Sequence, residues 1–278
     1  MYIKTKVKTL PLSDYTHVMG ILNITPDSFS DGGRYTTIDL AVERALKMEA
    51  EGADIIDVGG ESTRPNHEPV TVEEEIARVI PVIEALEKRL SIPISIDSYK
   101  AETAEAAIKA GASIINDIWG AKHDPNIAHV AAKYDVPIIL MHNRMNKQYD
   151  SLIDDMIVDL EASIKIAKDA GVPDGNIILD PGIGFALELE DNYLVMQELE
   201  RFTKHFPYPF LLATSRKSFI SKVLPNEAEE RDNATGATTC FGITKGVHIV
   251  RVHDVKRTVE LTKMMDAMVK GLGDNGQN

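Results

Sequence analysis

The sequence contains eight short apolar runs, and each run is followed by a longer segment with helical periodicity. The runs span residues 17–22, 54–58, 93–96, 113–115, 136–140, 176–179, 210–213 and 247–250. Short apolar runs that alternate with amphipathic segments are typical of βα units, which form parallel sheets. Eight such units within 278 residues favour an α/β fold of the (β/α)8 type, a TIM barrel, over an open doubly wound sheet.

The segments after the runs predict eight helices. They are expected at residues 39–51, 72–90, 100–110, 126–133, 152–170, 189–204, 237–245 and 255–270. Gly52, Gly111 and Gly171 stand where three of these helices should end, because a helix often ends on a residue with a left-handed backbone. Asp254 is placed to cap the start of the last helix.

The chain is predicted to form one domain over residues 1–278, because no linker rich in proline, serine or glycine divides it. Its 44% hydrophobic residues are enough for one sizeable core. Residues 1–14 are expected to form an extension that contains a short strand, and residues 271–278 a flexible tail.

Charge and apolar content argue against several kinds of partner. The formal net charge of −13 predicts repulsion from nucleic acid and from anionic membranes. No apolar stretch approaches the roughly 18 residues of a membrane-spanning helix, and residues 1–10 do not resemble a signal peptide. The single cysteine, Cys240, can form no intramolecular disulfide, which fits a reducing compartment. We therefore expect a cytoplasmic protein.

Polar residues follow all eight apolar runs. They are Asn23, Glu61 to Arg64, Asp97, Asn116, His142, Asp180, Ser215 to Ser218, and Arg251 with His253. In TIM barrels the active site lies at the carboxyl ends of the strands, so these side chains are expected to ring one polar pocket. Two long, glycine-bearing connections at the same end, residues 25–35 and 59–70, are typical of lids over a site.

A cluster of basic residues is predicted after the seventh and eighth strands. Arg216 and Lys217 stand at an expected helix start, and Arg251 and His253 follow the eighth strand. Barrel enzymes often bind phosphate at these two loops, where backbone N–H groups and a helix dipole favour an anion. On a strongly acidic protein, this shared position predicts a phosphate or diphosphate site.

Asp97, Asn116 and Asp180 stand at the ends of three other strands. Their oxygens and amide could hydrogen-bond a heterocycle rich in N–H groups. These three residues could equally bind a metal. Zinc sites usually include histidine, which this set lacks, whereas Mg²⁺ carried by a diphosphate would suit these oxygen ligands. Asp180 precedes Pro181 and Gly182, so it could instead shape a turn.

Other residues in the sequence have simpler interpretations. His142 is either a base or a hydrogen-bonded histidine of the core or rim, and Trp119 is expected to pack rather than to stack on a ligand. Glu73, Glu74 and Glu75 open a predicted helix, where carboxylates complement the helix dipole, and this explanation gives them no other role.

Seven motifs together resemble the dihydropteroate synthase family. They span Gly20 to Gly33, Gly59 to Pro65, Ser95 to Ser98, Ile115 to Ile118, Leu179 to Phe185, Thr214 to Ser218 and Arg251 to Asp254. Each motif is moderately specific, and the ordered set is highly specific. The resemblance implies a pterin-binding barrel, usually a homodimer, that condenses 6-hydroxymethyl-7,8-dihydropterin diphosphate with 4-aminobenzoate in folate biosynthesis, using Mg²⁺ and releasing diphosphate.

The resemblance also assigns roles to single residues. Pterin binding falls to Asp97, Asn116, Asp180 and Lys217. Diphosphate binding falls to Asn23, Arg251 and His253, with Asn23 beside Mg²⁺. The 4-aminobenzoate positions are Thr63, Pro65, Phe185 and Ser218, and the loop-closure positions are Phe29, Asp31 and Arg64. The residues expected to be catalytic are Asp31, Asp97, Lys217, Arg251 and His253.

Three positions depart from the commoner family pattern. Asn66 stands where glycine is usual, Ala213 replaces a frequent glycine, and Leu187 occupies a position that is often lysine. Because they lie beside the matched residues, they bear on loop dynamics and inhibitor response more than on the reaction.

The chemistry implied by the resemblance is an SN1-like displacement, because the electron-rich pterin can delocalise positive charge at the departing methylene. One alternative is a methyltetrahydrofolate-dependent methyltransferase of the same barrel family, which should not need Lys217 with Arg251 and His253. Another is a catalytically silent pterin-binding paralogue, which loss of Asp31, Arg64 or Lys217 would have suggested. All five residues are present.

Overall fold

The computed structural model describes residues 1–24, 34–61 and 69–271, without the side chains of residues 34–37 and 229. Its centre is a parallel sheet with the strand order β8-β7-β6-β5-β4-β3-β10-β9. The strands are β3 His17–Asn23, β4 Ile55–Gly59, β5 Ile94–Asp97, β6 Ile114–Asp117, β7 Ile138–Met141, β8 Ile177–Asp180, β9 Leu211–Leu212 and β10 Ile249–Val252. A parallel bridge between Leu179 and Phe210 joins β8 to the β9 side, so the sheet closes into a barrel.

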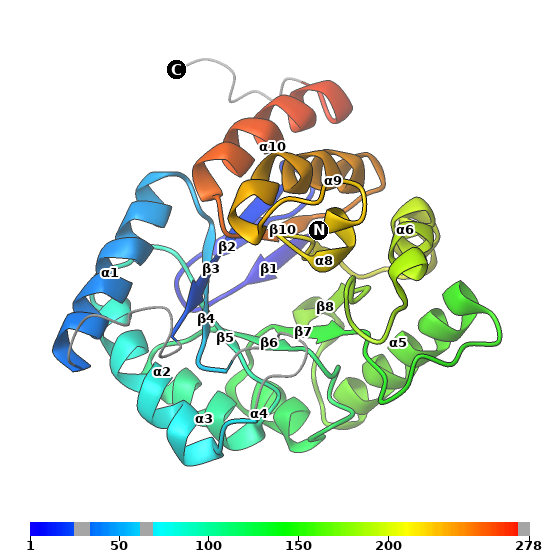
Figure 1. Cartoon of the computed structure of the whole chain (residues 1–278). Coiled ribbons are helices and arrows are strands. Elements are labelled where there is room, and N and C mark those ends of the chain that lie inside the picture. The colour runs from blue at the N-terminus through cyan, green and yellow to red at the C-terminus, as the bar shows by residue number, and fades with distance from the viewer. Residues whose placement is uncertain (25–33, 62–68, 272–278) are drawn as a thin grey trace.

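Helices surround this barrel, as Figure 1 shows. They are α1 Arg34–Ala50, α2 Val72–Glu87, α3 Ala101–Ala110, α4 Asn126–Tyr134, α5 Leu152–Asp169, α6 Leu189–Gln197, α7 Leu199–His205, α8 Ser218–Ser221, α9 Asp232–Thr244 and α10 Val255–Val269. The predicted (β/α)8 barrel is therefore confirmed. No helix in the described part of the chain is long and apolar enough to cross a membrane.

All eight predicted strands are present, with ends shifted by at most two residues. The segment 189–204 was wrongly predicted as one helix. It forms α6 and α7, because the backbone at Glu198 leaves the helical region at φ −93° and ψ 9°. Leu199 and Phe202 beyond the break are buried, so a one-residue interruption leaves the apolar pattern of the sequence unchanged.

The residues predicted to end or cap helices agree with the structure, although α1 and α9 begin five residues before the predicted positions, at Arg34 and Asp232. Gly52, Gly111 and Gly171 have φ values of +100°, +125° and +95°, the left-handed backbone that glycine adopts without steric cost. The Asp254 carboxylate accepts a hydrogen bond from the Arg257 N–H over 3.1 Å and so caps α10. Short α8 Ser218–Ser221 begins directly after Arg216 and Lys217, where a helix start was expected.

The N-terminal extension forms a hairpin rather than the single short strand that was predicted. Antiparallel strands β1 Tyr2–Lys4 and β2 Thr9–Pro11 form it. Its buried side chains form one cluster with the inward apolar residues of the barrel: Ile3, Leu10, Leu12, Met19, Ile55, Ile114, Ile139, Ile178, Leu211, Ala213 and Ile249. Most of these barrel residues lie near the starts of their strands, so the hairpin closes the N-terminal end of the barrel.

Candidate active site

A layer of polar side chains lies inside the barrel, next to the apolar layer and closer to the carboxyl ends of the strands. Successive side chains of a strand point to opposite faces, so a residue two positions after an inward residue also points inward. The inward residues Ile55, Ile114, Ile178 and Ile249 are followed in this way by Asp57, Asn116, Asp180 and Arg251. The strand pattern alone thus collects charged and amide groups at one end of the barrel.

Arg251 connects this polar layer across the barrel. Its Nε donates to Asp57 Oδ2 over 2.6 Å, and its Nη2 donates to Asp97 Oδ2 over 2.5 Å. Asn116 Nδ2 donates to the same oxygen of Asp57 over 3.0 Å. Four residues from four different strands therefore form one buried hydrogen-bonded network.

Asp57 is a site residue that sequence analysis missed. It is completely buried, and its second oxygen, Oδ1, has no hydrogen-bond partner among the described residues. A signal was present, because a carboxylate in the middle of an apolar run needs a partner in the interior. The run 54–58 was interpreted only as a strand, and Asp57 received no role.

The electrostatics of the network follow from one guanidinium facing two carboxylates. Burial raises the pKa of Asp97 to about 7, with Arg251 opposing the rise and the Asp57 charge adding to it. Burial alone would lower the pKa of Arg251, but Asp57 and Asp97 outweigh that effect and raise it. Arg251 therefore stays charged, and the proton-accepting group of the network is a carboxylate.

Asp180 and Lys217 lie beside this network, within electrostatic reach of each other and of Arg251. Asp180 Oδ1 accepts the Gly182 N–H over 2.7 Å, so Asp180 does shape its turn, but it also lies within electrostatic reach of Lys217. Lys217 Nζ donates to the Ile183 carbonyl and lies 4.7 Å from the centre of the Phe185 ring. Burial raises the pKa of Asp180 to about 6 and lowers that of Lys217 to about 8, while their opposite charges moderate both shifts.

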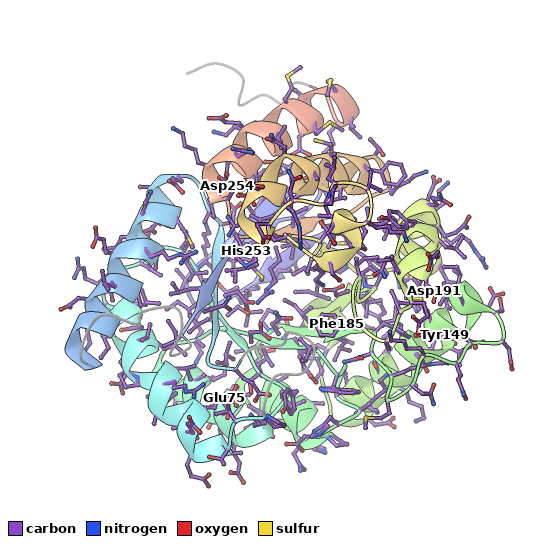
Figure 2. The ribbon with its side chains drawn as sticks, viewed as in Figure 1. Glu75, Tyr149, Phe185, Asp191, His253 and Asp254 are labelled. Atoms are coloured by element: carbon purple, nitrogen blue, oxygen red, sulfur yellow. The ribbon has the colours of Figure 1, made fainter. Side chains whose placement is uncertain are left out.

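His253 lies directly after β10 and contacts Ser215, with 2.8 Å between Nδ1 and Oγ. Figure 2 shows His253 where α8 and α9 approach the barrel strands, and Phe185 beside β8. Burial and the positive charges of Arg216 and Arg251 lower the pKa of His253 to about 3. Arg216, predicted as part of the anion site, is held by Asp232 through two hydrogen bonds of 2.8 Å.

The remaining predicted positions lie at the rim or outside the described residues. Asn23 ends β3 and is partly buried, Phe185 is partly buried, and Ser218 is exposed at the start of α8. Ala213 and Leu187 are buried in the core. Phe29, Asp31, Thr63, Arg64, Pro65 and Asn66 lie outside the described residues.

The interpretation of Glu75 as a simple partner of the helix dipole was wrong. Its side chain is 1% exposed, and its Oε2 accepts hydrogen bonds from Lys100 Nζ over 2.9 Å and from Thr103 Oγ1 over 3.0 Å. Lys100 Nζ also donates to Glu61. Figure 2 shows Glu75 on α2 near α3. Burial explains this arrangement, because a carboxylate inside the fold requires a cation or hydrogen-bond donors.

His142 is a hydrogen-bonded histidine of the fold. It is fully buried, its Nε2 lies 3.0 Å from Asp159 Oδ2, and Arg144 Nε donates to the same oxygen over 2.5 Å. Burial lowers the pKa of His142. Of the two interpretations left open by the sequence, the structure supports the structural one. Within the described residues, no group of three or more His, Cys, Asp or Glu side chains could hold a metal ion.

Comparisons with known proteins agree with this arrangement. The barrel and its polar layer match the class of pterin binding enzymes, whose family model covers residues 19–253. The dihydropteroate synthase of Bacillus subtilis is 59% identical over 267 residues, which cover 96% of this chain and 93% of that protein. That of Clostridium beijerinckii is 54% identical over 269 residues, covering 96% of this chain and 100% of that protein. The chain belongs to the dihydropteroate synthase family.

Solved structures give the same result. A crystal structure of a Clostridium difficile dihydropteroate synthase, obtained in the presence of pteroic acid, has a TM-score of 0.90 and 48% identity. The match covers 92% of this chain and 97% of that one. A Xanthomonas albilineans dihydropteroate synthase with 4-aminobenzoic acid has a TM-score of 0.90 and 38% identity, covering 95% and 96% of the two chains.

Proposed function

We propose that this chain condenses (7,8-dihydropterin-6-yl)methyl diphosphate with 4-aminobenzoate to give 7,8-dihydropteroate and diphosphate. One observation carries the proposal. Inside one end of the barrel, the buried Asp97, Asn116 and Asp180 lie close to the cations Lys217 and Arg251. The first set suits a heterocycle with several N–H groups, and the second suits an anion. The named relatives and their ligands support the same reaction.

The pterin is proposed to lie on the polar layer. Asp180 and Asp97 would accept hydrogen bonds from its N–H groups, and the Asn116 amide can both accept and donate. Lys217, which lies within electrostatic reach of Asp180, would position the ring as a cation. A Schiff base at Lys217 has no role, because the reaction contains no carbonyl adduct.

The diphosphate is proposed to lie near Asn23, Arg251 and His253, at the ends of β3 and β10. Asn23 supplies one amide oxygen, and no described residue is recorded as a hydrogen-bond partner of its side chain. This donor set fits Mg²⁺ carried by the diphosphate, because Mg²⁺ commonly takes one or two protein oxygens together with phosphate and water. Bound there, Mg²⁺ would neutralise charge on the leaving diphosphate.

The proposed displacement is dissociative. As the C–O bond to diphosphate breaks, positive charge develops on the methylene and spreads into the pterin ring. Asp97 and Asp180 hold the ring and stabilise its cationic form, while Arg251 and His253 stabilise the departing anion. The amine of 4-aminobenzoate, held near Phe185 and Ser218, then forms the C–N bond and loses a proton. An aniline nitrogen is weakly basic and needs no strong base before attack.

We further propose that the chain acts as a cytoplasmic homodimer. Its one cysteine, Cys240, fits a reducing compartment. Exposed apolar side chains lie on α9 and α10: Phe241 is 41%, Met264 59% and Met268 61% exposed. An exposed apolar face is typical of an interaction surface. Analytical ultracentrifugation of wild-type chain and Met264→Glu tests this, and a monomer at every concentration of the wild type would oppose it.

The function is tested by following diphosphate release from the pterin diphosphate, with and without 4-aminobenzoate and with Mg²⁺ or a chelator. Release that depends on 4-aminobenzoate and Mg²⁺, and that yields dihydropteroate, supports the proposal. Lys217→Ala should abolish it, whereas Lys222→Ala, at an exposed lysine of the same region, should not. Tight pterin binding without turnover would instead indicate a silent pterin-binding protein.

A further inference from the structure

Ser215 and His253 contact each other at the carboxyl ends of neighbouring strands of the barrel. Ser215 follows β9 and is 7% exposed, and His253 directly follows β10. The serine Oγ lies 2.8 Å from the ring nitrogen Nδ1 of His253. The same Oγ accepts the backbone N–H of His253 over 3.1 Å. One hydroxyl therefore engages both the backbone and the ring of a single residue.

The position of the ring hydrogen decides what His253 can offer to an anion. Burial and the charges of Arg216 and Arg251 lower the pKa of His253 to about 3, so the ring is neutral at neutral pH. A neutral imidazole carries a hydrogen on only one of its nitrogens, and only that nitrogen can donate. A ring with its hydrogen on Nδ1 would present a lone pair, rather than a donor, on its Nε2 edge.

Counting donors and acceptors around Ser215 distinguishes the two tautomers. A hydroxyl has one hydrogen to donate and two lone pairs to accept with. If Nδ1 carried the hydrogen, Ser215 Oγ would accept twice, and its own hydrogen would have no acceptor among the described residues. If Nε2 carries the hydrogen, Oγ accepts the backbone N–H and donates to Nδ1, so every group is paired. Buried polar groups are nearly always paired, which favours the second arrangement.

We propose that Ser215 is a positioning residue that holds His253 in the tautomer with its hydrogen on Nε2. No described residue forms a hydrogen bond with Nε2, so that N–H is available to a ligand. Its use toward diphosphate rests on the proposed function, whereas the tautomer is a property of the chain without ligand. A donor fixed before the reaction stabilises developing negative charge without reorganisation.

The tautomer can be measured directly by long-range ¹H–¹⁵N correlation NMR on ligand-free chain labelled with ¹⁵N-histidine. The signals of His253 are those that disappear in His253→Gln. We expect the pattern of a neutral ring with its hydrogen on Nε2, unchanged between pH 6 and 8. A ring with its hydrogen on Nδ1 would overturn the proposal. The result does not depend on whether the chain turns over any substrate.

Variants of Ser215 test whether the serine sets the tautomer. Ser215→Ala should give a mixture of tautomers and weaken binding of inorganic diphosphate by about threefold to tenfold, the net size of one typical hydrogen bond. Ser215→Thr keeps the hydroxyl and should restore both. Ser163→Ala, at a buried serine of α5 with no partner in the described structure, controls for loss of a buried hydroxyl. An unchanged tautomer in Ser215→Ala would refute the role of Ser215.

Substitutions of His253 provide an independent test. Glutamine places an amide nitrogen near the position of Nε2, and asparagine places one near Nδ1. If Nε2–H is the donor, His253→Gln should bind inorganic diphosphate more tightly than His253→Asn. Equal affinity, or tighter binding by His253→Asn, would contradict the proposal. If the chain binds diphosphate normally but has no synthase activity, the proposed function is refuted and the inference about Ser215 and His253 is not.

Discussion

The guanidinium of Arg251 lies against the carboxylate of Asp97, with 2.5 Å between Nη2 and Oδ2. A pterin presents a similar edge, since its 2-amino group and ring N–H resemble a guanidine. Arg251 therefore occupies an acceptor that the proposed substrate needs. In the proposed complex the pterin would compete with Nη2 for Asp97, while Nε can remain on Asp57, 2.6 Å away. Asp57 would then hold Arg251 within the polar layer.

Asp57→Asn should weaken the site and the fold together. Removing one of two carboxylates leaves Arg251 dependent on Asp97, so the arginine competes more strongly with the pterin. Breaking a buried ion pair typically costs about 3–5 kcal/mol. We expect a lower free energy of unfolding by urea and roughly tenfold weaker pterin binding by calorimetry. The exposed Asp169→Asn is the control, and unchanged pterin affinity in Asp57→Asn would contradict the role of Asp57.

The pH dependence of kcat/KM for the pterin diphosphate should be bell-shaped. Below a pH of about 6 to 7, Asp180 and Asp97 take up protons and lose acceptors for the ring N–H groups. Above about 8, Lys217 loses its proton and its charge. The rate should therefore fall on both sides of this window. A profile of kcat/KM against pH measures this window. Lys217→Arg should shift the alkaline limb to higher pH. If that limb does not shift, its titration belongs to a group other than Lys217.

Lys100→Met should destabilise the fold, because it leaves two buried carboxylates without their shared cation. The side chains of Glu61 and Glu75 are 3% and 1% exposed. We expect a loss of about 3 kcal/mol or more in chemical denaturation. Lys109→Met, at an exposed lysine that pairs with Glu105 on the same helix, should change stability little. Equal effects of the two variants would show that burial of the Lys100 cluster does not matter.

Gly182→Ala should disturb the turn that Asp180 holds. The φ of Gly182 is +73°, and an added Cβ would lie 2.1 Å from the carbonyl oxygen of His142, so the backbone has to move. We predict loss of pterin binding and a lower melting temperature. Gly175→Ala meets no atom within 4 Å and should be tolerated. Normal pterin binding by Gly182→Ala would show that the turn does not position Asp180.

Much of the barrel could be predicted because its signal is local. Each strand is a short apolar run, and each βα unit repeats the same pattern, so eight strands follow from the sequence. The hairpin was harder, because β1 and β2 are three residues each, and each has only one buried residue, Ile3 and Leu10. The break at Glu198 was missed because a change in backbone angle leaves the apolar period intact.

The polar layer could be predicted only in part. Asp97, Asn116 and Asp180 end their strands and were therefore noticed as a group. Asp57 belongs to the same layer, but it lies inside an apolar run, and its partner Arg251 is 194 residues away. Glu75 similarly shows its role only through Lys100, on a different part of the chain. Pairing across such separations is set by the closed barrel and not by local sequence.

The N-terminal hairpin closes one end of the barrel, so the interior can be reached only from the carboxyl ends of the strands. Ile3, Leu10 and Leu12 fill its base, so no ligand can enter or leave through that end. Asn116 and Asp180 lie deep, at 4% and 3% exposure, whereas Ser218 lies exposed at the rim. In the proposed reaction this difference in depth would make the pterin bind before 4-aminobenzoate, because the pterin residues lie below the residues at the rim.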